Sequence, residues 1–121
     1  MKQGVRACVA YIAGRLISRR EAALIYDASQ SKHIAIGGFV GASSIDIHDY
    51  LRDCKMSGTG SRARSYRLYD HGEAQHLSLT IEGDKFEGYD FGSICHFRGK
   101  VDGSEISFYD YGETRSYSYR I

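Results

Sequence analysis

The chain has 121 residues, enough for one domain with its own core and too few for two domains of ordinary size. Hydrophobic residues make up 42% and charged residues 26%, which excludes a disordered chain. Residues 1–21 carry five basic residues and one acidic residue, whereas residues 22–121 carry 11 basic and 14 acidic residues. Because basic charge does not cover the body of the chain, we expect no nucleic-acid partner.

Residues 1–21 predict an amphipathic helix that precedes a repetitive body, residues 22–121, within a single domain. Large apolar residues recur on one face of this helix, and small residues lie on the other. The large residues are Val5, Val9, Ile12 and Leu16. Within residues 1–21 the longest uncharged run is eight residues, "ACVAYIAG", which is too short for a membrane span, and no signal-peptide cleavage site follows it. We therefore expect a capping helix and no membrane partner.

The three cysteines, Cys8, Cys54 and Cys95, are far apart and form no metal-binding or disulfide pattern. A reducing compartment fits this usage, so we expect a cytoplasmic protein. No motif for a phosphate, a nucleotide or another cofactor is present, and no cofactor is predicted.

A Tyr-Asp signature recurs through the body in five copies, with His48 replacing Tyr in the second. The copies are Tyr26-Asp27, His48-Asp49, Tyr69-Asp70, Tyr89-Asp90 and Tyr109-Asp110, at spacings of 22, 21, 20 and 20 residues. A period of this kind indicates a repeat architecture. The last three copies also share a glycine two residues after Asp, which gives the pairs Asp70 and Gly72, Asp90 and Gly92, and Asp110 and Gly112. We interpret these pairs as structural turns in which a solvated Asp accepts backbone N–H groups and Gly adopts a positive φ.

Between the signatures, apolar and polar residues alternate, as they do in strands that bury one face. An all-β fold is therefore predicted, and we favour a β-solenoid of about five 20-residue repeats capped by the N-terminal helix. In a solenoid, equivalent residues of successive coils stack, which explains why the same residue types return. The last strand, within "SYSYRI" (residues 116–121), would then be an unpaired edge that pairs with another copy of the chain.

The alternative fold is an up-and-down antiparallel meander closed into a barrel, with the helix as a lid or plug. Here Gly83-Asp84 and Gly103-Ser104 would form two-residue type II′ turns, and Gly92-Ser93 and Gly112-Glu113 would do the same at the other end. This register pairs Ile81 with Phe86 and Phe108 with Tyr117.

The candidate ligand-binding residues form a row of aromatic side chains, namely Tyr69, His76, Tyr89, His96 and Tyr109. Such a row can stack sugars, although cross-strand packing alone also explains it. We expect His76 and His96 to lie one strand spacing apart, but two histidines are too few for a metal site, and no metal is predicted. Cys95 and His96 are adjacent, so they point to opposite faces of a strand and cannot form a nucleophilic pair. No catalytic residue is predicted.

The Tyr-Asp signature resembles the YD repeats of large bacterial Rhs-type proteins. Here Gly follows Asp by two residues rather than three, and the Arg-Leu that normally follows is absent. No function is carried over from this resemblance.

The sequence therefore predicts a non-enzymatic scaffold or interaction module that associates with itself through its C-terminal edge. The alternative is a ligand-binding module that takes carbohydrate on the Tyr and His row or an apolar molecule inside a barrel. The identity of a protein or carbohydrate partner stays open at this point.

Overall fold

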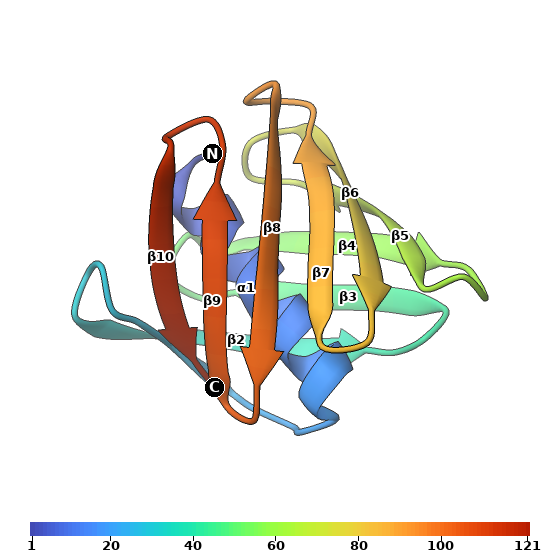
Figure 1. The fold of residues 1–121 in the computed structure, drawn as a ribbon, viewed down its shortest axis with the longest axis horizontal. Coiled ribbons are helices and arrows are strands. Elements are labelled where there is room, and N and C mark those ends of the chain that lie inside the picture. Colours follow the sequence, from blue (N-terminus) through green and yellow to red (C-terminus); the bar gives the residue numbers. More distant parts are fainter.

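The computed structural model describes residues 1–121, which form one helix and ten strands (Figure 1). Helix α1 spans Gln3–Ser18. The strands are β1 Leu24–Asp27, β2 Lys32–Val40, β3 Ser44–Asp49, β4 Cys54–Gly60, β5 Ser65–Asp70, β6 Gln75–Glu82, β7 Lys85–Asp90, β8 Cys95–Asp102, β9 Glu105–Asp110 and β10 Arg115–Arg120.

All ten strands pair antiparallel with their neighbours and close into one barrel, in the order β1-β10-β9-β8-β7-β6-β5-β4-β3-β2. The favoured β-solenoid is therefore wrong, and the alternative, a meander closed into a barrel, is confirmed. The reason lies in the connections between strands. They are tight turns of two to four residues, and each joins two strands that hydrogen-bond to each other, whereas the two strands of a solenoid coil would face each other from separate sheets.

The barrel closes where β1 meets β10, through the pairs Tyr26↔Arg120 and Asp27↔Tyr119. On its other side, β10 pairs with β9 from Arg115 to Arg120. The C-terminal strand thus has partners on both sides, and the expected bare edge is wrong. Self-association through that edge loses its structural basis.

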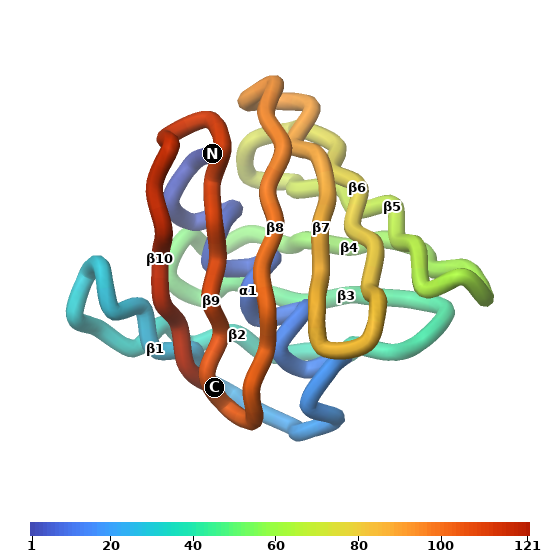
Figure 2. Tube along the Cα trace, in the orientation of Figure 1, coloured from blue at the N-terminus to red at the C-terminus, as the bar shows by residue number.

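Helix α1 lies inside the barrel, between its two walls (Figure 2). Every residue from Val5 to Gly14 is buried, on all sides of the helix. The prediction of a helix that caps a repeat is wrong, and its role as a plug in the alternative fold is confirmed. The side opposite the large apolar residues carries Ala7, Ala10 and Ala13, which need no contact with water. A barrel of ten strands has room for such a slender helix, which then supplies its core.

Aromatic rings from the barrel wall complete the core around α1. Phe108 lies at their centre, with its ring centroid 5.3 Å from that of Phe97, 5.7 Å from that of Phe86 and 6.3 Å from that of Tyr119. The Tyr11 hydroxyl of α1 donates a hydrogen bond to the carbonyl of Ala22, just before β1. Helix α1 itself is not long and apolar enough to cross a membrane.

The two-residue turns predicted at one end of the barrel are confirmed. Gly83 and Gly103 have φ angles of 62° and 61°, and the residue after each has no positive φ, as type II′ turns require. The predicted register is also correct, because Ile81 pairs with Phe86 and Phe108 with Tyr117.

The turns at the opposite end differ from the prediction. Each has four residues, and the left-handed residue is the fourth after Asp. These residues are Ser31, Asp53, Ala74, Ile94 and Thr114, with φ between 52° and 54°. Gly72, Gly92 and Gly112 have no positive φ, so that part of the prediction is wrong. Close packing, rather than a positive φ, explains why these three positions hold glycine.

A side chain from the preceding repeat covers each of these glycines. A Cβ on Gly92 would collide with the amide oxygen of Gln75, and a Cβ on Gly72 would lie 2.6 Å from the Cys54 sulfur. Likewise, a Cβ on Gly112 would lie 3.0 Å from the Cys95 sulfur.

The location of α1 predicts how the thiols react in the folded protein. Cys8 faces the barrel wall and is fully buried, and burial raises the pKa of its thiol, whereas Cys54 is partly exposed. In the variant Cys54→Ser/Cys95→Ser, we expect a thiol reagent such as DTNB to modify Cys8 only at the rate of unfolding. The matched variant Cys8→Ala/Cys95→Ser, which retains Cys54, should react faster. Equal rates in folded protein would contradict an enclosed helix.

Candidate functional site

The densest cluster of ionisable groups is a ring of five aspartates at the end of the barrel that holds the N-terminus of α1. Asp27, Asp49, Asp70, Asp90 and Asp110 end the five odd-numbered strands and are 0–1% exposed. The predicted solvated carboxylates are therefore wrong. Each Asp continues the alternation of its strand at an inward position, and partners inside the barrel make that position tolerable.

These carboxylates accept backbone N–H groups of their own turns, as predicted. Asp90 Oδ1 accepts from Gly92 at 2.9 Å and from Ser93 at 3.1 Å, and Asp110 Oδ1 accepts from Gly112 at 2.9 Å. The signature is thus a capped turn, with the cap directed into the protein.

Cations compensate three of the five carboxylates in the ring. Arg52 bridges two repeats, with Nε 2.7 Å from Asp49 Oδ2 and Nη2 2.8 Å from Asp70 Oδ1. Burial alone would lower the pKa of Arg52, but its bonds to Asp70 and Asp49 outweigh that effect and raise it. Arg6 Nη1 of α1 lies 3.3 Å from Asp110 Oδ2.

The Met1 amino group also contacts Asp110, at 3.1 Å. Burial alone would raise the pKa of this carboxyl, yet the amino group and the backbone N–H groups of Glu113 and Gly112 together hold the pKa below its ordinary value. The remaining two carboxylates use neutral donors. Gln75 Nε2 lies 2.5 Å from Asp90, and Gln30 Nε2 lies 2.6 Å from Asp27.

The ring of aspartates is enclosed within the protein. Its carboxylates are shielded from solvent, so a substrate does not reach them, and their lone pairs are mostly used within the protein. No group of three or more His, Cys, Asp or Glu side chains is placed to hold a metal ion.

The predicted aromatic row lies on the outside of the barrel, but it is not a continuous ladder. Tyr69, Tyr89 and Tyr109 are half-buried. Tyr69 packs edge-on against His76 with ring centroids 4.7 Å apart, and Tyr89 does the same with His96 at 4.8 Å. These pairs belong to single hairpins, and β7 separates His76 on β6 from His96 on β8. The two histidines are therefore separated by at least two strand spacings, about 10 Å or more, rather than by one strand spacing.

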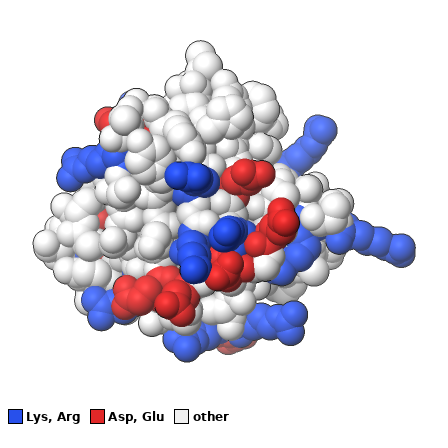
Figure 3. Space-filling model, in the orientation of Figure 1, with Lys and Arg blue, Asp and Glu red and all other residues white.

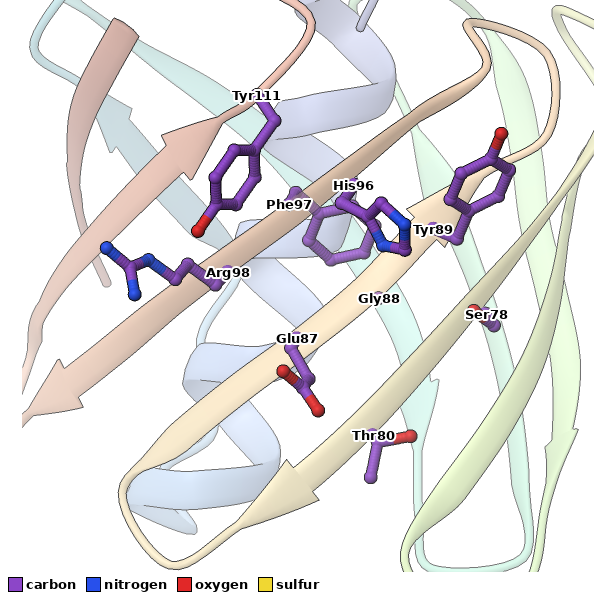
Figure 4. A pocket seen from close by; sticks show the side chains of 9 residues that line it. All are labelled: Ser78, Thr80, Glu87, Gly88, Tyr89, His96, Phe97, Arg98 and Tyr111. Carbon is purple, nitrogen blue, oxygen red and sulfur yellow. The ribbon is translucent and has the colours of Figure 1, made fainter. Parts of the chain in front are cut away.

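A groove of about 470 Å³ crosses the outer face of β6, β7 and β8 (Figure 4). Its walls contain two of the predicted residues, Tyr89 and His96, and exclude Tyr69, His76 and Tyr109. The other lining residues are Ser78, Thr80, Glu87, Gly88, Phe97, Arg98 and Tyr111. Figure 4 shows Tyr89 beside His96 on one side and Tyr111 on the other, with Arg98 extending away from Glu87.

Gly88 creates the floor of this groove. The equivalent positions in the other repeats hold Ile25, Ile47, Leu68 and Phe108. A Cβ on Gly88 would collide with the carbonyl oxygen of Ser78 and would lie 2.5 Å from Phe97 Cζ. Because Gly88 has no side chain, the Phe97 ring can approach the backbone of β7 closely. The barrel wall is therefore thin at this point.

Arg98 is held by aromatic rings and leaves its hydrogen-bonding groups free. Its guanidinium carbon lies 5.9 Å from the ring centroid of Tyr109 and 5.7 Å from that of Tyr111. Glu87 is its direct cross-strand partner, yet the two form no salt bridge. A free guanidinium and a free carboxylate therefore face the same groove.

Sequence reasoning missed Arg98, Glu87 and Tyr111 because it searched for positions that repeat. The signal was a departure from the repeat, since the position of Arg98 holds Ala35, Ser57, Ser78 or Ser118 in the other copies. Comparisons of the chain with protein families, curated proteins and solved structures find no match.

Removing the cation that bridges Asp49 and Asp70 should strongly destabilise the barrel. We expect Arg52→Met to lower the free energy of unfolding by about 3–5 kcal/mol, because two buried carboxylates lose their charge partner. Arg52→Lys should cost less, since it keeps the charge but not the forked geometry. Urea denaturation measures both, with the exposed Arg67→Met as control. A loss no larger than that of the control would show that Arg52 does not hold the ring together.

The lowered pKa of Asp110 predicts a dependence of stability on pH. A carboxyl with a lower pKa in the folded state stabilises the protein above its unfolded value, ordinarily 3.8, and this stability is lost as the pH falls through the folded pKa. The difference in unfolding free energy between wild type and Asp110→Asn should thus be larger at about pH 6 than at about pH 2. Glu73→Gln, at an exposed carboxyl that forms no salt bridge, should show little change. A difference that is constant with pH would contradict the ion pairs of Asp110.

Proposed function

We propose that the protein is a non-enzymatic carbohydrate-binding module that holds a saccharide in the groove over β6, β7 and β8. The observation that carries this proposal is the free Arg98 guanidinium, which lies beside two tyrosine rings and lines the same groove as the unpaired Glu87. Both lie beside the rings of Tyr89 and Tyr111.

The chemistry of this groove suits a sugar ring. A pyranose has flat patches of C–H groups and an edge of hydroxyl groups. Aromatic rings pack on the C–H patches, while planar charged groups such as those of Arg98 and Glu87 can bond two adjacent hydroxyls at once. Ser78 and Thr80 add hydroxyls along one wall. A few polar groups within an aromatic setting are typical of binding sites for small molecules.

The interior of the barrel supports this choice over an apolar ligand. Helix α1 fills the space that such a ligand would need, with buried residues on all its sides. The paired C-terminal strand likewise removes the argument for a scaffold that assembles through its edge.

The groove also favours binding over hydrolysis. Glu87 is the only acidic residue in its lining. Most glycosidases need two carboxyl groups that flank the scissile bond, and the five inward aspartates are shielded from solvent.

A glycan array followed by isothermal titration calorimetry tests the proposal. We expect Tyr111→Ala and Arg98→Ala each to weaken binding of the best saccharide about tenfold or more, which corresponds to about 1.4 kcal/mol. The matched controls are Tyr50→Ala, at the equivalent exposed position of the second repeat, and Arg67→Ala on β5. Thermal melting checks that each variant folds.

Two results would overturn the proposal. One is that no saccharide on the array binds the wild-type protein. The other is that the two controls weaken binding as much as the two groove variants, because binding would then lie elsewhere on the surface.

A further inference from the structure

We infer that the saccharide carries acidic groups, sulfate or carboxylate, which bind in a second groove next to the first. This inference rests on the proposed function and specifies its ligand class. The second groove has a volume of about 430 Å³ and lies over β7 to β10. Arg98 lines both grooves, so one elongated ligand can contact it from either side.

The lining of the second groove is basic. It contains three cations, Lys85, Arg98 and Lys100, and no carboxylate. Three hydroxyl groups, those of Ser107, Ser116 and Ser118, face the same space and can donate hydrogen bonds to anionic oxygens. Sulfate and carboxylate groups bind most strongly to such charged donors, and a guanidinium can hold two of their oxygens at once.

Two of these cations repel each other and so destabilise the folded protein. Lys85 on β7 and Lys100 on β8 are direct cross-strand partners, and like charges in that position destabilise a sheet. The only salt bridge that relieves them joins Lys100 to Asp84 at 3.7 Å, between side chains that are both more than half exposed. On its other side Lys85 has Glu82 as its cross-strand partner, but the two form no salt bridge, so part of the repulsion stays uncompensated. Such repulsion is expected where an anionic ligand supplies the missing charge.

The surroundings favour a saccharide with separate acidic groups over a nucleic acid. Figure 3 shows acidic side chains interleaved with basic ones on the face that carries β7 to β9. Glu87 adjoins Arg98 across the strands, and Glu105 on β9 lies 3.6 Å from Arg120. A strand of nucleic acid carries a charge at every nucleotide and would meet these carboxylates, whereas a sulfated sugar can place its charges between them.

Calorimetry with four probes tests the inference. The probes are a sulfated heparin hexasaccharide, a hyaluronan hexasaccharide, neutral chitohexaose and an oligothymidine of ten nucleotides. We expect the wild-type protein to bind one of the two acidic saccharides at least tenfold more tightly than chitohexaose. Lys85→Ala/Lys100→Ala should remove that advantage while leaving any binding of chitohexaose unchanged. Arg98→Ala should weaken both. The control is Lys55→Ala, an exposed lysine on β4.

A measurement without ligand gives an independent check. Lys85→Ala removes one of two facing like charges, and its other cross-strand partner, Glu82, forms no salt bridge with it. The thermal midpoint of this variant should therefore rise above that of wild type at low salt. A fall in the midpoint would contradict the repulsion on which the inference depends.

The outcomes separate this inference from the proposed function. Equal binding of neutral and acidic saccharides overturns the inference and leaves the proposed function standing, as does acidic binding that survives Lys85→Ala/Lys100→Ala. Tighter binding of oligothymidine that is lost in the same variant identifies a nucleic-acid site and overturns the inference. If no saccharide here or on the array binds, both proposals fail.

Discussion

The ring of inward aspartates is the interaction on which the rest of the structure depends. Each carboxylate fixes the turn of its own hairpin through backbone N–H groups, and several also bind a group from elsewhere in the chain. Arg52 joins two hairpins and lies directly against Gly4 of α1, while Arg6 ties the helix to Asp110. The same side chains thus set the turns, the circumference of the barrel and the position of the helix within it.

A fold held together from the inside leaves its outer surface free to differ from one repeat to the next. Most inward positions repeat Asp or a large apolar residue, because each must meet the same helix or its neighbours. The outward position three residues before Asp instead holds Leu24, Asp46, Arg67, Glu87 and Ser107 in the five repeats. Specific recognition needs such asymmetry, since a fully repeated surface offers every ligand five equivalent sites.

Enclosure of the helix also determines where chemistry can occur. The interior holds five carboxylates and two buried thiols, yet these groups are shielded from solvent. Any ligand of this protein would therefore have to bind on the outer face, where Glu87 and Gly88 on β7 and Arg98 on β8 depart from the repeat. Gly88 thins the wall there, and Arg98 places a free guanidinium between the two grooves. The candidate site thus lies where the sequence departs from the repeat, on a barrel whose other repeats are regular.

The sequence by itself determined the five repeats, the alternation of the strands, a helix within residues 1–21 and the glycine turns at Gly83 and Gly103, because these features depend on local spacing and backbone preference. Only the tertiary structure decided between coil and barrel, since a 20-residue unit of two strands has the same alternation whether its neighbours are parallel or antiparallel. The direction of the aspartates was decided in the same way. A buried carboxylate is tolerable only with partners nearby, and Arg6 and Arg52 become partners of Asp110 and Asp70 only when the barrel closes around the helix.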